Sequence, residues 1–182
     1  PDGFSINLNT RLIGESNLSN LTAAVIIALR LGVSHDQIMQ AVSRIEQVEH
    51  RLSMKRTPQG VTIIDDAYNS NPVGSRMAVE ALGRFTDGRR IIVTPGMIEL
   101  GDKQIELNTE FGRHIARNVD VAIIVGRYNR DAIIAGIEEE NILAEDSIIL
   151  VDSFNEAMQY LSPRMKKGDT VLYENDLPDT FK

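Results

Sequence analysis

Two acids, a tyrosine and two asparagines gather directly after one apolar stretch of the chain. Residues 62–72 read TIIDDAYNSNP, and these side chains belong to Asp65, Asp66, Tyr68, Asn69 and Asn71. A carboxylate only accepts hydrogen bonds, whereas an amide side chain both donates and accepts them. That much polar chemistry where a buried strand ends indicates a loop that binds a ligand.

The elements that would position this loop follow an alternating pattern from Met54 onward. Short apolar runs predict strands at residues 61–65, 90–94, 121–125, 148–151 and 170–173. Amphipathic segments between them predict helices at about 73–85, 103–117, 129–138 and 154–162. Strands that are apolar on both faces and separated by helices are typical of an α/β fold with a doubly wound, mostly parallel, Rossmann-like sheet.

Two further loops are expected at the same edge of that sheet. One, TPGMIELG at 94–101, follows the strand at 90–94, and the other, ENDLPD at 174–179, follows the strand at 170–173. Ligands of open parallel sheets bind outside the carboxyl ends of the strands. Gly96 would let the backbone of the first loop approach a ligand closely. The three loops together therefore predict one cleft.

Some of these polar residues also have a purely structural interpretation. Asn71 followed by Pro72 is typical of a helix start, with the amide as N-cap and proline at the first helical position. Asp65 could brace a turn, and Tyr68 could be a half-buried anchor. The three histidines are scattered along the chain with no partner at metal-ligand spacing, so we expect no metal site from them.

Composition excludes several classes of protein. The chain carries 26 acidic and 19 basic side chains, a net charge of −7, so it lacks the basic field that nucleic-acid binding needs. It has no cysteine for a disulfide framework and no apolar run long enough to span a membrane. No G-x-G-x-x-G follows a strand, which argues against a dinucleotide oxidoreductase, and no P-loop motif occurs in this sequence either. A phosphorylated receiver module is disfavoured because the central strands end IIVTP and AIIVG, without an acceptor aspartate.

The amino-terminal part of the chain has a different pattern. Residues 17–31, NLSNLTAAVIIALRL, are apolar on nearly every face and stop at Gly32, which predicts a buried helix. A second helix is expected after Ser34, with an apolar stripe at Ile38, Ala41, Val42 and Ile45. We place a domain boundary near Glu49. Because the chain opens with Pro1, without a methionine or a basic leader, we expect it to be part of a longer cytoplasmic protein.

Five ordered motifs resemble those of the Mur ligases. They are GESNLSNLTAAV at 14–25, HRL at 50–52, IIDDAYNSNP at 63–72, TPGMIELG at 94–101 and ENDLPD at 174–179. The third and the last are most similar to the member that joins D-alanyl-D-alanine to UDP-N-acetylmuramoyl-tripeptide in bacterial peptidoglycan precursor synthesis. The resemblance implies that residues 50–182 are the C-terminal Rossmann-like domain of a three-domain, ATP-dependent amide ligase. Residues 1–49 would then be a helical end of its central ATP-binding domain, whose P-loop and metal ligands lie upstream.

The resemblance also implies roles for individual residues. Such ligases make an acyl phosphate from ATP, with Mg²⁺ bridging the phosphates, and an amine then attacks it. Arg51 matches the catalytic arginine that reaches the phosphates, and Asp66 matches the acid that holds the ribose. Asn17 and Asn20, three residues apart on one helix face, match the pair beside the adenine. Candidate contacts for the dipeptide are Tyr68, Asn69, Asn71, Gly96, Glu99, Asn175 and Asp176.

One departure from the family pattern and two alternatives remain. The family usually has a histidine where this chain has Ser16, which weakens any role for that position. For Asn17 and Asn20, an N-cap and a polar helix turn are the structural alternative. The alternative function is a self-standing nucleotide- or peptide-binding module that keeps the ligase fold without the chemistry. A P-loop upstream of this sequence would discriminate the two functions in favour of the ligase.

Overall fold

A mostly parallel sheet organises the chain, which a computed structural model describes over residues 5–176. Within this range the sheet has six strands in the order β1-β2-β6-β3-β4-β5. Every neighbouring pair is parallel except β1 and β2. The strands are β1 Ser53–Arg56, β2 Thr62–Asp66, β3 Arg90–Thr94, β4 Val121–Val125, β5 Ile148–Val151 and β6 Thr170–Glu174. The predicted fold class is confirmed, with β1 as an edge strand that the sequence analysis missed.

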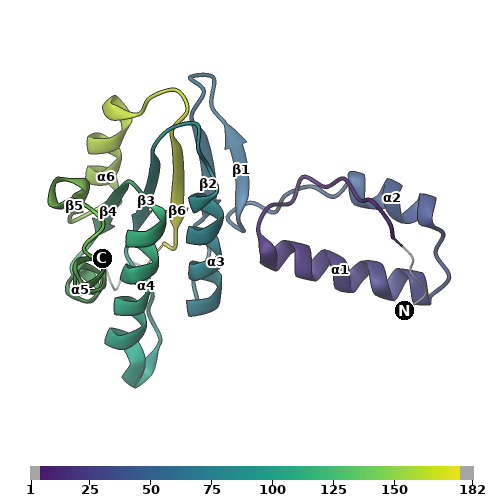
Figure 1. The fold of residues 1–182 in the computed structure, drawn as a ribbon, viewed down its shortest axis with the longest axis horizontal. Coiled ribbons are helices and arrows are strands. Elements are labelled where there is room, and N and C mark those ends of the chain that lie inside the picture. The colour runs from purple at the N-terminus through teal and green to yellow at the C-terminus, as the bar shows by residue number, and fades with distance from the viewer. Residues whose placement is uncertain (1–4, 177–182) are drawn as a thin grey trace.

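Helices cover both faces of this sheet (Figure 1). On one face lie α3 (Pro72–Gly83), α4 (Gln104–Asn118) and α5 (Arg130–Glu140), and on the other lies α6 (Phe154–Leu161). The crossovers from β2 to β3, from β3 to β4 and from β4 to β5 run in one direction across the sheet, and the crossover from β5 to β6 runs in the opposite direction. Because such crossovers are right-handed, the return places α6 on the opposite face. Short 3₁₀ turns lie at Gly101–Lys103, Glu145–Ser147 and Ser162–Arg164.

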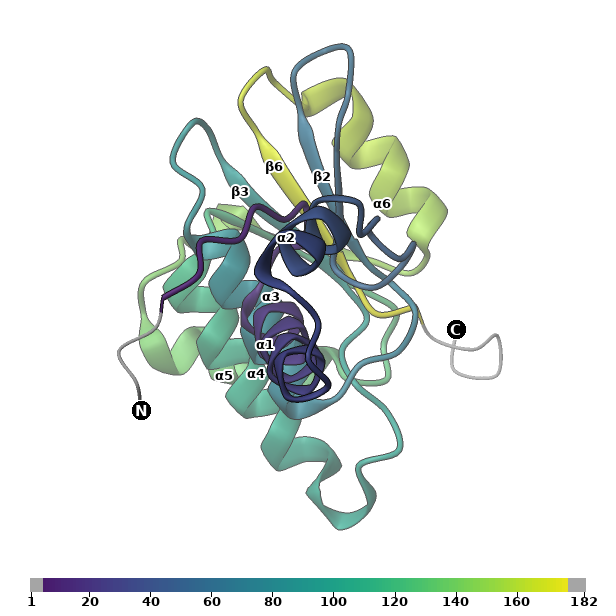
Figure 2. The ribbon, with the colours of Figure 1, turned by 90° about the vertical axis from the view of Figure 1, so that its right-hand side faces the viewer.

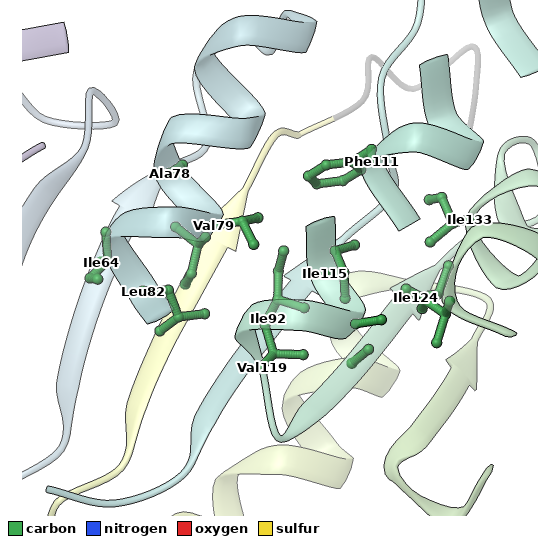
Figure 3. Packing of buried hydrophobic residues seen from close by; sticks show 14 of the residues in the cluster. Ile64, Ala78, Val79, Leu82, Ile92, Phe111, Ile115, Val119, Ile124 and Ile133 are labelled. Atoms are coloured by element: carbon green, nitrogen blue, oxygen red, sulfur yellow. The ribbon is translucent and has the colours of Figure 1, made fainter. Parts of the chain in front are cut away.

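Alternate residues of the central strands supply two separate hydrophobic cores. The larger core packs against α3, α4 and α5 and contains the strand residues Ile64, Ile92, Ile124 and Leu172 (Figure 3). The smaller core packs against α6 and contains the strand residues Ile63, Ile91, Val93, Ile123 and Val171. Side chains alternate between the faces of a strand, so strands buried on both faces appear as continuous apolar runs. This is why their positions could be predicted from sequence.

Two glycines let α4 and α5 approach each other closely. A Cβ atom on Gly112 would lie 2.2 Å from the carbonyl oxygen of Ile133, and one on Gly136 would lie 1.9 Å from that of Thr109. Side chains at these positions would push the helices apart. The close contact holds α4 in place, and α4 in turn anchors one of the candidate site loops.

Two helices, α1 (Glu15–Arg30) and α2 (His35–Ser43), lie beside the sheet next to β1 (Figures 1 and 2). Ser34 forms the expected N-cap of α2, in a capping box with Gln37. The prediction that α1 is buried is wrong for the described residues, because Leu18 and Ile27 are each 60% exposed. The apolar side chains of α1 and α2 form only a small cluster, which covers one face of α1. None of the described helices is long and apolar enough to cross a membrane.

Candidate functional site

Three loops meet at one edge of the sheet, as predicted. The strands β2, β6 and β3 are neighbours, so residues 67–71, 175–176 and 95–100 follow their carboxyl ends side by side. Asn175 joins them: its side-chain amide donates to the Gly96 carbonyl oxygen at 2.6 Å, and its backbone N–H donates to the Asp66 carbonyl oxygen at 3.2 Å. Residues 177–179 of the ENDLPD motif lie outside the described residues.

Asp66 holds residues 48–52, here called the linker, against the first of these loops. Its Oδ1 accepts a hydrogen bond from the Leu52 N–H at 2.8 Å. Burial raises the pKa of Asp66, although the Leu52 N–H and the Arg51 guanidinium oppose that shift and Asp65 adds to it. Next to it, Asp65 pairs with His50 Nδ1 at 2.9 Å. The acid thus has a structural contact in addition to any ligand contact.

Arg51 and Tyr68 lie against each other beside this linker. The guanidinium carbon of Arg51 is 4.2 Å from the centroid of the Tyr68 ring, a cation–π contact. Tyr68 is 64% exposed, so its interpretation as a half-buried anchor is wrong. A hollow of about 280 Å³ lies between α1 and the linker, and both Asn17 and Arg51 line it. Asn20 is exposed on the same helix but does not line the hollow.

Asn71 is confirmed as the N-cap of α3. Its Oδ1 accepts from the Gly74 N–H at 3.0 Å, and Pro72 occupies the first helical position. Asn69 is exposed in the same loop. The structure therefore gives Asn71 a local role and leaves its contact with a ligand a prediction.

The loop after β3 is anchored from beneath by a buried amide. Asn108 of α4 accepts from the Met97 N–H at 2.9 Å and donates to the Met97 carbonyl oxygen at 3.0 Å. Gly96 is buried with φ 78°, and a Cβ atom there would lie 2.6 Å from Asn108 Oδ1. Only glycine fits that backbone without strain. Glu99 is exposed with φ 62° in the same loop.

Glu174 is the buried acid that the sequence analysis missed. It ends β6, is 1% exposed, and contacts Ser70 and Thr94 beneath the loops. Burial raises the pKa of Glu174 to about 7, against hydrogen bonds from the Ser70, Ser75 and Thr94 hydroxyls that lower it. A carboxylate closing an otherwise apolar strand was the available signal, but the strand was predicted to end at residue 173.

A cleft of about 440 Å³ opens on the α6 side of this edge. Its apolar wall includes Phe154 and Tyr173, whose rings meet edge to face with centroids 5.6 Å apart. The polar lining consists of His50, Asp65, Asp152, Ser153, Asn155, Asn175 and Asp176. Carboxylates beside an apolar wall suit a small ligand with an ammonium group. The contributions of the segments after β4 and β5 were not expected from sequence.

The fold and the candidate site define a class of protein: an α/β domain with a mostly parallel sheet and three loops that meet at the carboxyl edge of its strands. Comparison of the sequence with protein families identifies the family within this class. The family model described as "Mur ligase, glutamate ligase domain" matches residues 50–173. This match covers more than half of the chain, so the chain belongs to the Mur ligase family. The position of the domain boundary remains a prediction.

Individual relatives come from more than one branch of that family. UDP-N-acetylmuramoylalanine–D-glutamate ligase of Lachnoclostridium phytofermentans is 30% identical over 89% of this chain and 33% of its own length. UDP-N-acetylmuramoyl-tripeptide–D-alanyl-D-alanine ligase of Bacillus subtilis is 22% identical over 90% of this chain and 35% of its own length. The crystal structure of MurF ligase from Thermotoga maritima in complex with ADP matches 95% of this chain and 37% of that one, with 26% identity and a TM-score of 0.77. The chain spans about a third of the length of these relatives.

Proposed function

We propose that this chain is part of an ATP-dependent amide ligase that adds D-alanyl-D-alanine to UDP-N-acetylmuramoyl-tripeptide through an acyl phosphate. The reaction would serve peptidoglycan precursor synthesis in the bacterial cytoplasm. The observation that carries this proposal is the contact of the linker with Asp66, which places Arg51 beside that acid and beside Asn17. Relatives named for this ligation, and a similar structure that holds ADP, support it.

The nucleotide half of the site would consist of Arg51, Asp66, Asn17 and Asn20. The planar guanidinium can bind two phosphate oxygens at once, and Tyr68 beneath it limits its rotamers. We assign the second carboxylate oxygen of Asp66 to the ribose, since Oδ1 already holds the Leu52 N–H. Mg²⁺ would neutralise phosphate charge, but the described residues contain no group of three acidic or histidine side chains that could hold it. Its ligands are expected in another part of a longer protein.

The acceptor half would use the cleft beside α6. The carboxylates of Asp65 and Asp176 would attract the ammonium group of the dipeptide, while Phe154 and Tyr173 would contact its methyl groups. Asn175, fixed by Gly96, would present polar groups at the rim. Tyr68, Asn69, Asn71 and Glu99 remain predicted dipeptide contacts; none of them lines this cleft.

The proposal is tested by assaying the longest natural form of the protein for ADP release that requires both peptide substrates. We expect turnover with UDP-N-acetylmuramoyl-tripeptide and D-alanyl-D-alanine, and little with UDP-N-acetylmuramoyl-L-alanine and D-glutamate. The second pair is the matched control because one relative is named for that reaction. Nucleotide binding without turnover on either pair would instead indicate the binding module. Turnover on the control pair alone would assign the chain to the D-glutamate branch.

Arg51→Lys tests the nucleotide half separately. Lysine keeps the charge but loses the forked geometry, so the rate should fall while the thermal midpoint barely changes. Arg84→Lys is a suitable control, because Arg84 also forms an exposed contact, with Glu15 at 2.8 Å, but lies away from the loops. Equal rates for the wild type and Arg51→Lys would contradict the assigned role.

A further inference from the structure

A chain of hydrogen bonds runs beneath the site loops from Glu174 to the start of α3. Glu174 Oε1 contacts the Ser70 hydroxyl, and the Ser70 hydroxyl contacts the Ser75 hydroxyl. The Ser75 hydroxyl donates to the Asn71 carbonyl oxygen at 2.9 Å. Glu174 and Ser75 are both 1% exposed. Three contacts in series thus connect β6 with the loop that precedes α3.

The number of protons available to this series of hydrogen bonds bears on the protonation state of Glu174. Three contacts need three protons, but the two serine hydroxyls supply only two, and a carbonyl oxygen supplies none. With an ionised Glu174, the Ser70 hydroxyl donates to the carboxylate, and the single proton of the Ser75 hydroxyl can serve only one of Ser70, Asn71 and Glu174, so one of the three contacts has no proton. A protonated Glu174 completes the series, because it donates to Ser70, Ser70 donates to Ser75, and Ser75 donates to Asn71.

The other carboxyl oxygen of Glu174 reaches the neighbouring loop. Oε2 accepts from the Thr94 hydroxyl at 2.9 Å, and Thr94 Oγ1 accepts from the Gly96 N–H at 3.0 Å. One carboxyl group therefore connects both loops that flank β6. Three hydroxyls face Glu174, those of Ser70, Ser75 and Thr94. The acid Asp66 of β2 also faces it, and its charge raises the pKa of Glu174. No cation contacts it among the described residues.

We propose that Glu174 is a positioning residue, held as the protonated acid, that fixes the loop before α3 and the loop after β3 for ligand binding. Release of its proton to solvent removes one of the three bonds in the chain. The Ser75 hydroxyl can then donate to Ser70 or to Asn71 but not to both, so one link between β6 and the start of α3 is lost, while the Ser75 N–H still donates to the Asn71 carbonyl oxygen at 2.9 Å. The effect on catalysis rests on the proposed function, whereas the protonation state does not.

The protonation state is tested by NMR on the 182-residue chain with ¹³C-labelled glutamate. We expect the Glu174 carboxyl to titrate near pH 7, and the amide signals of Ser75 and Gly96 to shift with the same midpoint. In Glu174→Gln the side-chain amide donates as the protonated acid does, so those amide signals should lose this titration. Glu106→Gln, a change at an exposed carboxyl, should leave it intact. A Glu174 midpoint near pH 4, or amide signals that ignore it, would overturn the proposal.

The consequence for binding is tested in the longest natural form of the protein. Above the midpoint, the KM for D-alanyl-D-alanine should rise about fivefold, the effect of one lost hydrogen bond, with kcat nearly constant. Glu174→Gln should keep the low KM at high pH, whereas Glu106→Gln should follow the wild type. If Glu174 only stabilises the fold, Glu174→Gln should melt at a lower temperature and its KM should depend on pH as in the wild type. That result would refute the positioning role. If the protein has no ligase activity, the NMR titration still decides the protonation state.

Discussion

Asp66 is expected to have two roles that two substitutions can separate. Asp66→Ala removes the acceptor of the buried Leu52 N–H, which should lower the free energy of unfolding by about 1–3 kcal/mol. Asp66→Asn keeps an acceptor oxygen at that place, so its loss should stay under about 1 kcal/mol. Both variants lose the charged acceptor assigned to the ribose. At about 2 kcal/mol, that loss corresponds to a roughly 30-fold higher KM for ATP.

The assay combines urea denaturation of each variant with steady-state kinetics of the longest natural form of the protein. The KM for D-alanyl-D-alanine should change little in either variant, since Asp66 does not line the α6-side cleft. Because burial raises the pKa of Asp66, the KM for ATP in the wild type should rise as the pH falls through that pKa. Asp66→Asn should lack this rise. An unchanged KM for ATP in Asp66→Asn would show that the acid only anchors the linker.

Two further predictions concern the architecture around the site. Asn71→Ala should lower the free energy of unfolding by about 1 kcal/mol, whereas Asn71→Ser should not, because serine can still cap α3. A higher KM for D-alanyl-D-alanine in Asn71→Ser would show that Asn71 also contacts the ligand. Arg89→Met should cost about 3 kcal/mol because Asp169, whose side chain is 3% exposed, loses its charged partner and keeps the backbone N–H donors of residues 89 and 166. At the next position, Arg90→Met should cost about 1 kcal/mol, since its partner Asp120 is 40% exposed to water. Similar urea midpoints for the two methionine variants would contradict this reasoning.

Much of the fold could be predicted from sequence because the central strands are apolar on both faces. The helix bounds agree within two residues, since each amphipathic segment has one face against a core. The strand β1 was missed because its residues, SMKR, form an exposed edge without a continuous apolar run. The exposed face of α1 was not predicted, because the distribution of apolar residues along a helix does not show how many other elements pack against it.

The candidate site was predictable only in part. Its loops could be placed at one edge because parallel strands point the same way, and Asn175 does join them. The end of an apolar strand was the one signal for the burial of Glu174, but its partners Ser70 and Thr94 lie far from it in sequence and could not be predicted. The role of Asn108 was also hidden, since an asparagine within a polar helix is ordinarily solvated.

The place of β6 in the sheet has a consequence for how the protein is made. Synthesis proceeds from the amino terminus, so β2 and β3 leave the ribosome long before the strand that must lie between them. Until residues 170–174 emerge, those strands have unpaired edges that can mispair with other chains. The Ser70–Glu174 contact spans 104 residues, so the chain must close a long loop before the site exists. A nascent chain therefore has no assembled ligand site, and a translation product that stops before β6 should aggregate rather than bind.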